Sequence, residues 1–373
     1  MRIALRRRMR WLAAGVFGTL GGLALIALLI AWSGAYSVAA SRGHWRIIDW
    51  ALAFGMRNSV EARARFIETP LLDDPNLVTL GAGHFHGGCA YCHGAPGVAI
   101  SPIARHMLPP PPDLSAATEA WKDPELFWIV KHGIKYTGMP AWVSQQRDDE
   151  VWAVVAFLKR LPHLDAQGYR QIAVGGLTIA PQSGRELAVS EAAPEATTAC
   201  ARCHGAEGQG PASNLVPVLH GQPREFLLAA LRDFASGKRE SGIMQPVASD
   251  LTASAMERLA GFYSRLPPPQ RSGTPDSAVI ERGRVLATEG LPDARIPACI
   301  SCHGAEALPI YPRLAGQYAG YMAGRLRLWR GGYIAHTETN DIMAPIARSL
   351  SDQQIEEVSA YFSAQPAISR GGK

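Results

Sequence analysis

Three five-residue segments of the chain share the pattern Cys-x-x-Cys-His, and together they use all six cysteines. Two thiols at this spacing can each form a thioether with one of the two vinyl groups of a porphyrin, and the histidine that follows can ligate the iron. The pattern is the attachment sequence of a c-type haem. We therefore predict three covalently bound haem c groups, held by Cys89, Cys92 and His93, by Cys200, Cys203 and His204, and by Cys299, Cys302 and His303.

Zinc and thiol redox sites also use Cys-x-x-Cys pairs. A structural zinc site needs four ligands, and no second Cys-x-x-Cys lies near enough in the sequence to complete them. The histidine recurs in the same place each time, which favours haem. The chain contains no dinucleotide-binding, P-loop or serine-hydrolase motif, and no catalytic residue is predicted.

A haem iron with one histidine needs a sixth ligand, and a methionine thioether is typical of electron-transfer cytochromes. Downstream of each motif lies a methionine that is followed within two residues by a proline, which stiffens the loop presenting the sulfur. The His-to-Met separation is 46 residues in the first case (139 − 93) and 40 in the others (244 − 204 and 343 − 303). We predict that the distal iron ligands are Met139, Met244 and Met343.

Other side chains near the motifs are weaker candidates for contact with a haem. Met107, in a proline-rich loop after His93, is an alternative distal ligand of the first haem. His84 and His86 precede the first motif, where a solvated or propionate-bonding role is the default for a histidine outside the pattern. Since a guanidinium group suits a carboxylate, three arginines are candidates for bonding the haem propionates: Arg147, Arg224 and Arg313.

Each methionine is followed 23 residues later by a proline, and an aromatic residue preceded by a small one lies five residues before that proline. These positions predict three equivalent closing helices over 148–161, 252–266 and 351–365, with Asp148, Thr252 and Ser351 as N-caps. The small-plus-aromatic pairs allow each closing helix to cross another helix closely: Ala156 with Phe157, Gly261 with Phe262 and Ala360 with Tyr361. The second and third repeats also share a Leu-x-Gly-Gln segment, at 219–222 and 314–317, which indicates tandem duplication.

The N-terminus predicts a membrane anchor. Trp11 to Trp32 is a run of 22 uncharged residues, and as a helix it would span about 33 Å, enough for a hydrocarbon core of about 30 Å. Five arginines in the first ten residues keep that end in the cytoplasm and place the rest outside. A cleaved signal peptide is the alternative, although its apolar region is usually shorter. Residues 44–66 carry a helical apolar stripe, which predicts a juxtamembrane helix.

Without those five arginines, the 32 remaining lysines and arginines balance the 32 aspartates and glutamates. No net basic surface is left, which excludes a nucleic-acid partner.

The three repeats resemble class I cytochrome c domains, and 183–373 resembles the tandem dihaem cytochromes c of bacterial periplasms. The resemblance rests on the Cys-x-x-Cys-His motifs, the methionine–proline segments and the Leu-x-Gly-Gln segments. It implies an all-α fold in which an N-terminal transmembrane helix precedes three small helical domains. The predicted parts are a basic tail (1–10), an anchor (11–32), a juxtamembrane segment (33–75), cytochrome c domains at 76–165, 183–269 and 277–373, and linkers at 166–182 and 270–276.

The resemblance implies a triheme, single-pass protein of the bacterial inner membrane whose bulk lies in the periplasm and carries electrons. Its expected redox partners are a terminal oxidase, a quinol-oxidising complex or a periplasmic dehydrogenase. Two alternatives stay open: a multihaem peroxidase-like enzyme with one open haem, and a cytochrome subunit that docks a dehydrogenase to the membrane.

Overall fold

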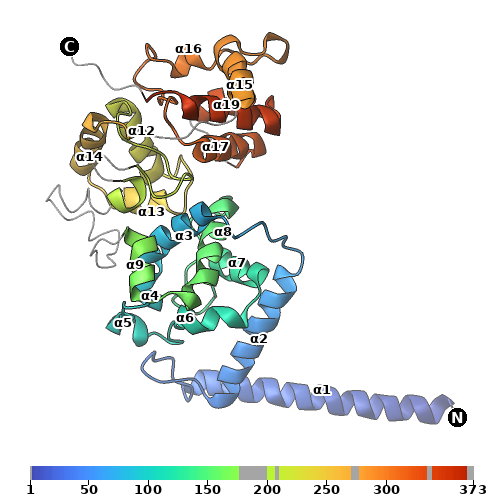
Figure 1. The fold of residues 1–373 in the computed structure, drawn as a ribbon. Coiled ribbons are helices and arrows are strands. Elements are labelled where there is room, and N and C mark those ends of the chain that lie inside the picture. Colours follow the sequence, from blue (N-terminus) through green and yellow to red (C-terminus); the bar gives the residue numbers. More distant parts are fainter. Residues whose placement is uncertain (1, 176–199, 206–209, 270–276, 334–337, 368–373) are drawn as a thin grey trace. The chain divides into compact units, whose positions relative to one another are not determined.

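The structure is a computed structural model that describes residues 2–175, 200–205, 210–269, 277–333 and 338–367. The described residues form helices and no strand, with isolated β-bridges between Ala95 and Val98 and between Leu291 and Ile296, which confirms the all-α prediction. The longer helices (Figure 1) are α1 (Arg2–Ser33), α2 (Arg46–Ala64), α3 (Pro75–Gly88), α7 (Asp123–His132), α8 (Asp148–Arg160), α9 (Ala166–Val174), α12 (Arg224–Ala235), α14 (Ala253–Arg265), α15 (Ser277–Glu289), α17 (Ala319–Gly331), α18 (Glu338–Arg348) and α19 (Asp352–Ala364). Short elements are α4 (Ala90–His93), α5 (Pro102–Arg105), α6 (Leu114–Ala117), η1 (Thr118–Ala120), η2 (Leu161–His163), α13 (Met244–Ser249), η3 (Pro292–Ala294) and α16 (Ile300–His303).

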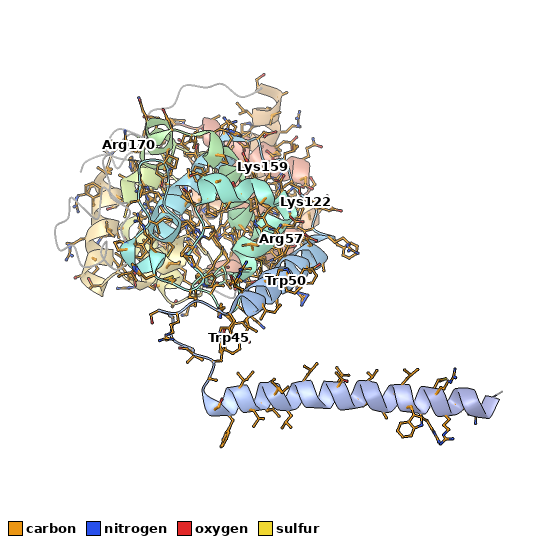
Figure 2. The ribbon with its side chains drawn as sticks, turned by 90° about the horizontal axis from the view of Figure 1, so that it is seen from below. Trp45, Trp50, Arg57, Lys122, Lys159 and Arg170 are labelled. Carbon is orange, nitrogen blue, oxygen red and sulfur yellow. The ribbon has the colours of Figure 1, made fainter. Side chains whose placement is uncertain are left out.

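The structure divides into two units, and the first, Met1–Ala53, contains α1. Among the described residues, one stretch, Arg6–Ser33, is long and apolar enough to cross a membrane. Its apolar side chains point outward along the whole helix (Figure 2), as suits a helix without a soluble partner. A signal sequence near the N-terminus can also meet these criteria of length and apolar composition, so α1 is compatible with both interpretations of the N-terminus. The predicted juxtamembrane helix is present as α2, and Trp45 and Trp50 are 48% and 61% exposed.

The second unit, Phe54–Lys373, contains three separate hydrophobic cores among its described residues. We call the residues around them the first group (67–175), the second group (200–269) and the third group (277–367). Each core lies within its own group, as three tandem domains require, while the domain boundaries stay predictions. One difference concerns 166–174, which was predicted to be linker: it forms α9, and its Tyr169 is fully buried in the first core. The remainder of that linker, the start of the second predicted domain and the linker at 270–276 lie outside the described residues.

The three closing helices are present as α8, α14 and α19. Two N-caps are confirmed: Thr252 accepts a hydrogen bond from the backbone N–H of Ala255, and Ser351 forms a capping box with Gln354. The prediction for Asp148 was wrong, because the helix begins one residue earlier than a cap at Asp148 requires and Arg147 occupies the N-cap position. Asp148 is instead the first residue of α8, where the positive end of the helix dipole stabilises its negative charge.

In the first and third groups, a glycine of the first helix allows the closing helix to cross it at short distance. A Cβ at Gly81 of α3 would collide with the carbonyl oxygen of Ala153 in α8, and a Cβ at Gly283 of α15 would collide with that of Glu357 in α19. The aromatic residues Phe157 and Tyr361 lie beside these crossings, as predicted, but the small residue that allows the approach is on the opposite helix. The first helix of the second group lies outside the described residues.

Candidate haem-binding sites

Each Cys-x-x-Cys-His motif forms a single helical turn. The first and third motifs lie on α4 and α16, and residues 200–204 are helical in the second. Side chains at i and i+3 of a helix share a face, so each turn presents its two thiols on the same side, as two thioethers to one porphyrin need. Five of the six cysteines are half-buried and Cys302 is exposed.

The histidine of every motif has the same hydrogen-bond partner, the carbonyl oxygen of a proline downstream. His93 Nδ1 donates to Pro112 at 2.9 Å, and His204 Nδ1 and His303 Nδ1 donate to Pro217 and Pro312 at 3.1 and 2.8 Å. A carbonyl oxygen can only accept, so Nδ1 carries the proton and Nε2 keeps its lone pair. Metal-ligating histidines are generally held in this way, with the second ring nitrogen bonded to a carbonyl or carboxylate.

Burial keeps these groups neutral. Desolvation lowers the pKa of His204 to about 4 and lowers the pKa values of His93 and His303, while the bond to the proline carbonyl opposes the shift. Burial also raises the pKa of Cys89 to about 12 and that of Cys200 to about 11. Among the described residues, no group of three or more His, Cys, Asp or Glu side chains is placed to hold a bare metal ion.

The predicted distal methionines are all half-buried, but they lie on different local structures. Met139 lies in a loop in which its backbone N–H donates to Thr137 Oγ1 at 3.1 Å. Met244 begins α13, and Met343 lies inside α18, whose Pro345 is also helical. The prediction of a loop around each methionine is therefore wrong for Met244 and for Met343, and it agrees with the structure at Met139. Assignment of the three sulfurs as iron ligands stays a prediction.

The first group contains two methionines near one loop. The sulfur of Met107 lies 2.7 Å from the position that a Cβ would take at Gly138, the residue before Met139. Met107, which is 14 residues after His93 in the sequence, therefore lies beside the predicted ligand loop. The two other candidates near this motif are placed differently: His86 Nδ1 is bonded to the Tyr169 hydroxyl at 2.9 Å, and His84 packs edge-on against Trp142.

Buried cations fit a group that carries carboxylates. The Nε atoms of Arg202, Arg239 and Arg325 are buried and have no hydrogen-bond partner among the described residues. Burial, reinforced by Arg239, lowers the pKa of Arg325 to about 9. Carboxylates such as the haem propionates are the natural partners of such guanidinium groups. These arginines were not singled out from the sequence, where they look like ordinary surface charges.

The arginines that were singled out have protein partners instead. Arg147 pairs with Glu150 at 2.9 Å, Arg224 lies 4.0 Å from Glu257, and Arg313 donates to the carbonyl oxygen of Gly221 at 3.3 Å.

Comparison with known families and proteins agrees with this chemistry. Residues 76–158 match the family described as cytochrome c oxidase, cbb3-type, subunit III, and residues 280–365 match the family described as cytochrome c. The thiosulfate dehydrogenase electron acceptor of Stutzerimonas stutzeri (strain A1501) is 36% identical over 48% of this chain and 84% of that protein. The cytochrome c4 of Thiocapsa roseopersicina is 35% identical over 50% of this chain and 96% of that protein. The chain belongs to the cytochrome c family.

Among solved structures, a cytochrome c4 from Acidithiobacillus ferrooxidans aligns with a TM-score of 0.41 at 30% identity, over 44% of this chain and 97% of that chain. A cytochrome c domain implies covalently bound haem c, whose iron carries one electron by changing between its ferrous and ferric states. The motif-bearing turns and the oriented histidines fit such a group.

In this cytochrome c, the second motif packs against the helix that leads into the first. Cys203 Sγ lies 3.1 Å from the position of a Cβ at Gly83 in α3, and the guanidinium group of Arg202 occupies the space beside Gly87. A larger residue at Gly83 would displace Cys203, the second cysteine of the second motif. The small residues of α3 therefore bring the first two motifs together.

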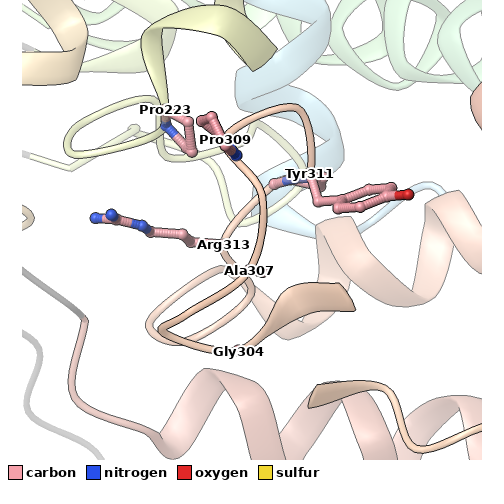
Figure 3. Close-up of a pocket in the computed structure, with 7 residues that line it drawn as sticks. Pro223, Gly304, Ala307, Pro309, Tyr311 and Arg313 are labelled. Carbon is pink, nitrogen blue, oxygen red and sulfur yellow. The ribbon is translucent and has the colours of Figure 1, made fainter. Parts of the chain in front are cut away.

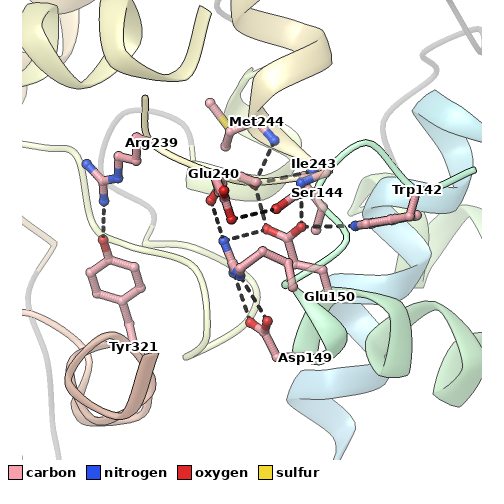
Figure 4. Close-up of polar contacts among 12 residues, drawn as sticks. Trp142, Ser144, Asp149, Glu150, Arg239, Glu240, Ile243, Met244 and Tyr321 are labelled. Carbon is pink, nitrogen blue, oxygen red and sulfur yellow. Dashed lines mark hydrogen bonds and ion pairs between the residues drawn. The ribbon is translucent and has the colours of Figure 1, made fainter. Parts of the chain in front are cut away.

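Figure 4 shows the main polar contact between the first and second groups, centred on Glu150 of α8. This carboxylate is 3% exposed and accepts hydrogen bonds from Ser241 Oγ at 2.5 Å, from the Gly242 N–H at 2.6 Å and from Trp142 Nε1 at 3.3 Å. Arg147 completes the site as an ion pair. Although burial disfavours its charge, the nearby carboxylates, Glu150 first, hold the pKa of Arg147 above its ordinary value.

The hydroxyl of Ser241 links this carboxylate to the predicted distal ligand of the second haem. It donates to Glu150 and accepts from the backbone N–H groups of Ile243 and Met244, at 3.3 and 3.0 Å. The start of α13, and with it Met244, is thus held by a residue of the first group. No sequence signal pointed to this contact, because Glu150 and Ser241 are 91 residues apart.

Proposed function

We propose that the chain is a membrane-anchored triheme cytochrome c that relays electrons outside the cytoplasm. The observation that supports this most strongly is the repeated histidine geometry: at each motif, a neutral imidazole is oriented by a proline carbonyl and keeps Nε2 for iron. Three tethered sites make successive electron transfers intramolecular, which raises the effective concentration of each site for the next.

The haem count tests the central claim. The purified full chain should contain three haems by pyridine haemochrome absorbance, and its intact mass should exceed that of the polypeptide by three haems. Replacement of both Cys200 and Cys203 by serine should remove one haem and leave two. A wild-type protein with only two haems would contradict the proposal.

The distal ligands are proposed to be Met139, Met244 and Met343, because a half-buried thioether with a fixed backbone needs little rearrangement when the iron changes its charge. Met139→Ala should open the first haem to carbon monoxide and remove its share of the weak long-wavelength Met–iron band. Met107→Ala is the matched control and should leave all three haems closed. The reverse result would transfer the ligand role to Met107.

Peroxide turnover by the wild-type protein would instead indicate an open haem. That result would favour the peroxidase-like alternative over a closed electron relay.

The membrane location is proposed from α1 and α2. α1 combines an arginine-rich start with an apolar stretch of sufficient length, and α2 exposes Trp45 and Trp50, which suit the headgroup region. Alkaline extraction of membranes from expressing cells should leave the protein in the membrane fraction, and the mature chain should retain its N-terminal residues by mass spectrometry. Recovery of a soluble protein that begins near Ala40 would show a cleaved signal peptide.

The electron donor is proposed to be a periplasmic dehydrogenase of the thiosulfate-oxidising class, because a relative that matches half of this chain is named as the acceptor of such an enzyme. The acceptor is proposed to be a terminal oxidase, because residues 76–158 match a family of oxidase subunits. Stopped-flow absorbance should show reduction of the haems by a thiosulfate dehydrogenase with its substrate, and reoxidation by a cbb3-type oxidase. If only a quinol-oxidising complex reduced the haems, that complex would be the electron donor in place of the dehydrogenase.

A further inference from the structure

The second and third groups exchange a pair of glutamines. Gln222 Nε2 donates to the carbonyl oxygen of Arg313 at 2.8 Å, and the Arg313 N–H donates back to Gln222 Oε1 at 3.0 Å. In the mirror contact, Gln317 Nε2 donates to the carbonyl oxygen of Val218 at 3.1 Å, and the Val218 N–H donates to Gln317 Oε1 at 2.9 Å. Both glutamine residues are buried, at 7% and 5% exposure. We call these four hydrogen bonds the glutamine clasp.

The clasp has the form of a two-fold interface. Gln222 and Gln317 end the two Leu-x-Gly-Gln segments, and Val218 and Arg313 directly precede them. Both pairs of positions are 95 residues apart (317 − 222 and 313 − 218). Each duplicated segment therefore supplies one glutamine and one backbone acceptor to the other, as self-complementary interfaces do.

The peptide group that each glutamine holds also binds an axial histidine. The N–H of Arg313 and the carbonyl of Pro312 belong to the same planar peptide unit. Gln222 binds one end of this unit, and His303 Nδ1 donates to the other. A hydrogen bond to the N–H polarises the peptide and strengthens its carbonyl as an acceptor. The chain of contacts therefore runs from the second group to the histidine of the third haem.

The reciprocal chain is present on the other side. Gln317 Oε1 accepts from the N–H of Val218, and the carbonyl of the same peptide, that of Pro217, accepts from His204 Nδ1. Pro223, which follows Gln222, also lines a small pocket with Pro309, Pro312 and Arg313 (Figure 3), so the backbone on both sides of the clasp is packed.

We propose that Gln222 and Gln317 are positioning residues for the axial histidine of the haem in the opposite group, so that each haem's reduction potential is set partly by its neighbour. The proposal rests on the proposed histidine ligation. A stronger carbonyl acceptor makes the imidazole a more electron-donating ligand, which stabilises ferric iron. Loss of a glutamine should therefore favour the reduced state of the haem across the interface.

The first group provides an internal reference. Its histidine is oriented in the same way by Pro112, but residues 76–165 contain no Leu-x-Gly-Gln segment. A glutamine variant should therefore leave the first haem unchanged.

The test compares the full chain with Gln222→Ala and Gln317→Ala by spectroelectrochemical titration. Met139→His, Met244→His and Met343→His variants, each of which moves one potential strongly, assign the three potentials to individual haems. Gln222→Ala should increase the equilibrium constant for reduction of the third haem by about three- to tenfold, and Gln317→Ala that of the second haem. Gln353→Ala, an exposed glutamine of α19, is the control and should shift neither.

Gln222→Glu separates positioning from mere structural support. A carboxylate still accepts from the Arg313 N–H, and more strongly than an amide does, so it should shift the third haem in the direction opposite to the alanine variant. A structural defect would shift both variants in the same direction.

Two results would overturn the proposal in a protein that still carries three haems. One is a larger shift in the potential of the haem in the group that contains the substituted glutamine than in that of the haem across the interface. The other is no shift in either potential. A wild-type haem count below three would instead refute the proposed function.

Discussion

The second group meets its two neighbours through different chemistry. Toward the first group, the contact is asymmetric: one buried carboxylate, Glu150, binds the 241–242 segment and acts through Ser241 on the backbone of Met244. Toward the third group, the contact is reciprocal and uncharged at its centre, and it acts through a proline peptide on the histidine side. The proposed second haem site is thus contacted by one neighbour on its methionine side and by the other on its histidine side.

This difference agrees with the repeats in the sequence. The second and third repeats share the Leu-x-Gly-Gln segment, so the same surface on each can be self-complementary, and one glutamine–backbone pair is used twice. The first repeat is more divergent and lacks this segment. Its junction needs dissimilar partners, and a charged acceptor with several donors is one such solution. Junctions of these two kinds should respond differently to mutation.

The largest effect is expected from substitutions that force the crossing helices apart. In Gly81→Ala and Gly283→Ala, the added methyl group would overlap a carbonyl oxygen of the crossing helix, so each should lower the free energy of unfolding of its group by about 3 kcal/mol. In mild denaturant, Gly81→Ala should also open the second haem to carbon monoxide, because Glu150 no longer holds Ser241. Gly283→Ala should leave that haem closed and move its potential.

Gly324→Ala, on α17 with nothing within 4 Å of the added Cβ, is the control and should not destabilise the third group. Identical responses of the second haem to both crossing variants would contradict the proposed difference between the junctions.

Removing the charge of Glu150 should have the next largest effect. In Glu150→Gln, Arg147 keeps Asp149 but loses its buried carboxylate partner, and Ser241 and the Gly242 N–H lose a charged acceptor, so the free energy of unfolding should fall by about 3 kcal/mol, within the range for breaking a buried ion pair. The Met–iron band of the second haem should weaken in the same variant. Denaturation followed by haem absorbance measures the free energy of unfolding and the Met–iron band, and the exposed Glu225→Gln is the control. An unchanged band would show that the contact at Glu150 does not affect Met244 as a ligand.

The clasp is expected to contribute less stability per residue. Gln222→Ala and Gln317→Ala should each lower the free energy of unfolding by about 2 kcal/mol, because each leaves a buried peptide group without its partner. The double variant should lose less than the sum of the two single losses, because the first change already loosens the interface on which the other contact depends. Strict additivity in a double-mutant cycle would show that the two halves act independently.

The smallest effect is expected from Ser241→Ala. Glu150 keeps its bonds from Arg147 and the Gly242 N–H, while the backbone of Met244 loses an acceptor, so the loss should be about 1 kcal/mol. A weakened Met–iron band of the second haem, with the third haem unaffected, should accompany it. Ser249→Ala, exposed on the same short helix, should change neither quantity.

Local patterns were sufficient for much of the molecule. The proline and aromatic spacing predicted α8, α14 and α19 to within one residue at each end, which is as close as helix boundaries are defined. The N-cap predicted at Asp148 was wrong, because Asp148 is the first helical residue and Arg147, which makes no side-chain capping bond, precedes it. Met244 and Met343 were expected in loops but are helical: Pro246 lies in the first turn of α13, where a proline is tolerated, and Pro345 lies inside α18.

The sequence by itself predicted the chemistry of this protein: three Cys-x-x-Cys-His motifs and an apolar N-terminal stretch, all of which depend on residues close together in the chain. Only the tertiary structure decided what surrounds each motif. The proline carbonyls that orient the histidines lie 9 to 19 residues downstream, in non-helical segments without a regular pattern. The glutamines that hold the same peptide units and the carboxylate behind Met244 lie 91 to 99 residues from their partners. These long-range contacts depend on packing between whole helical groups, and no local periodicity encodes them.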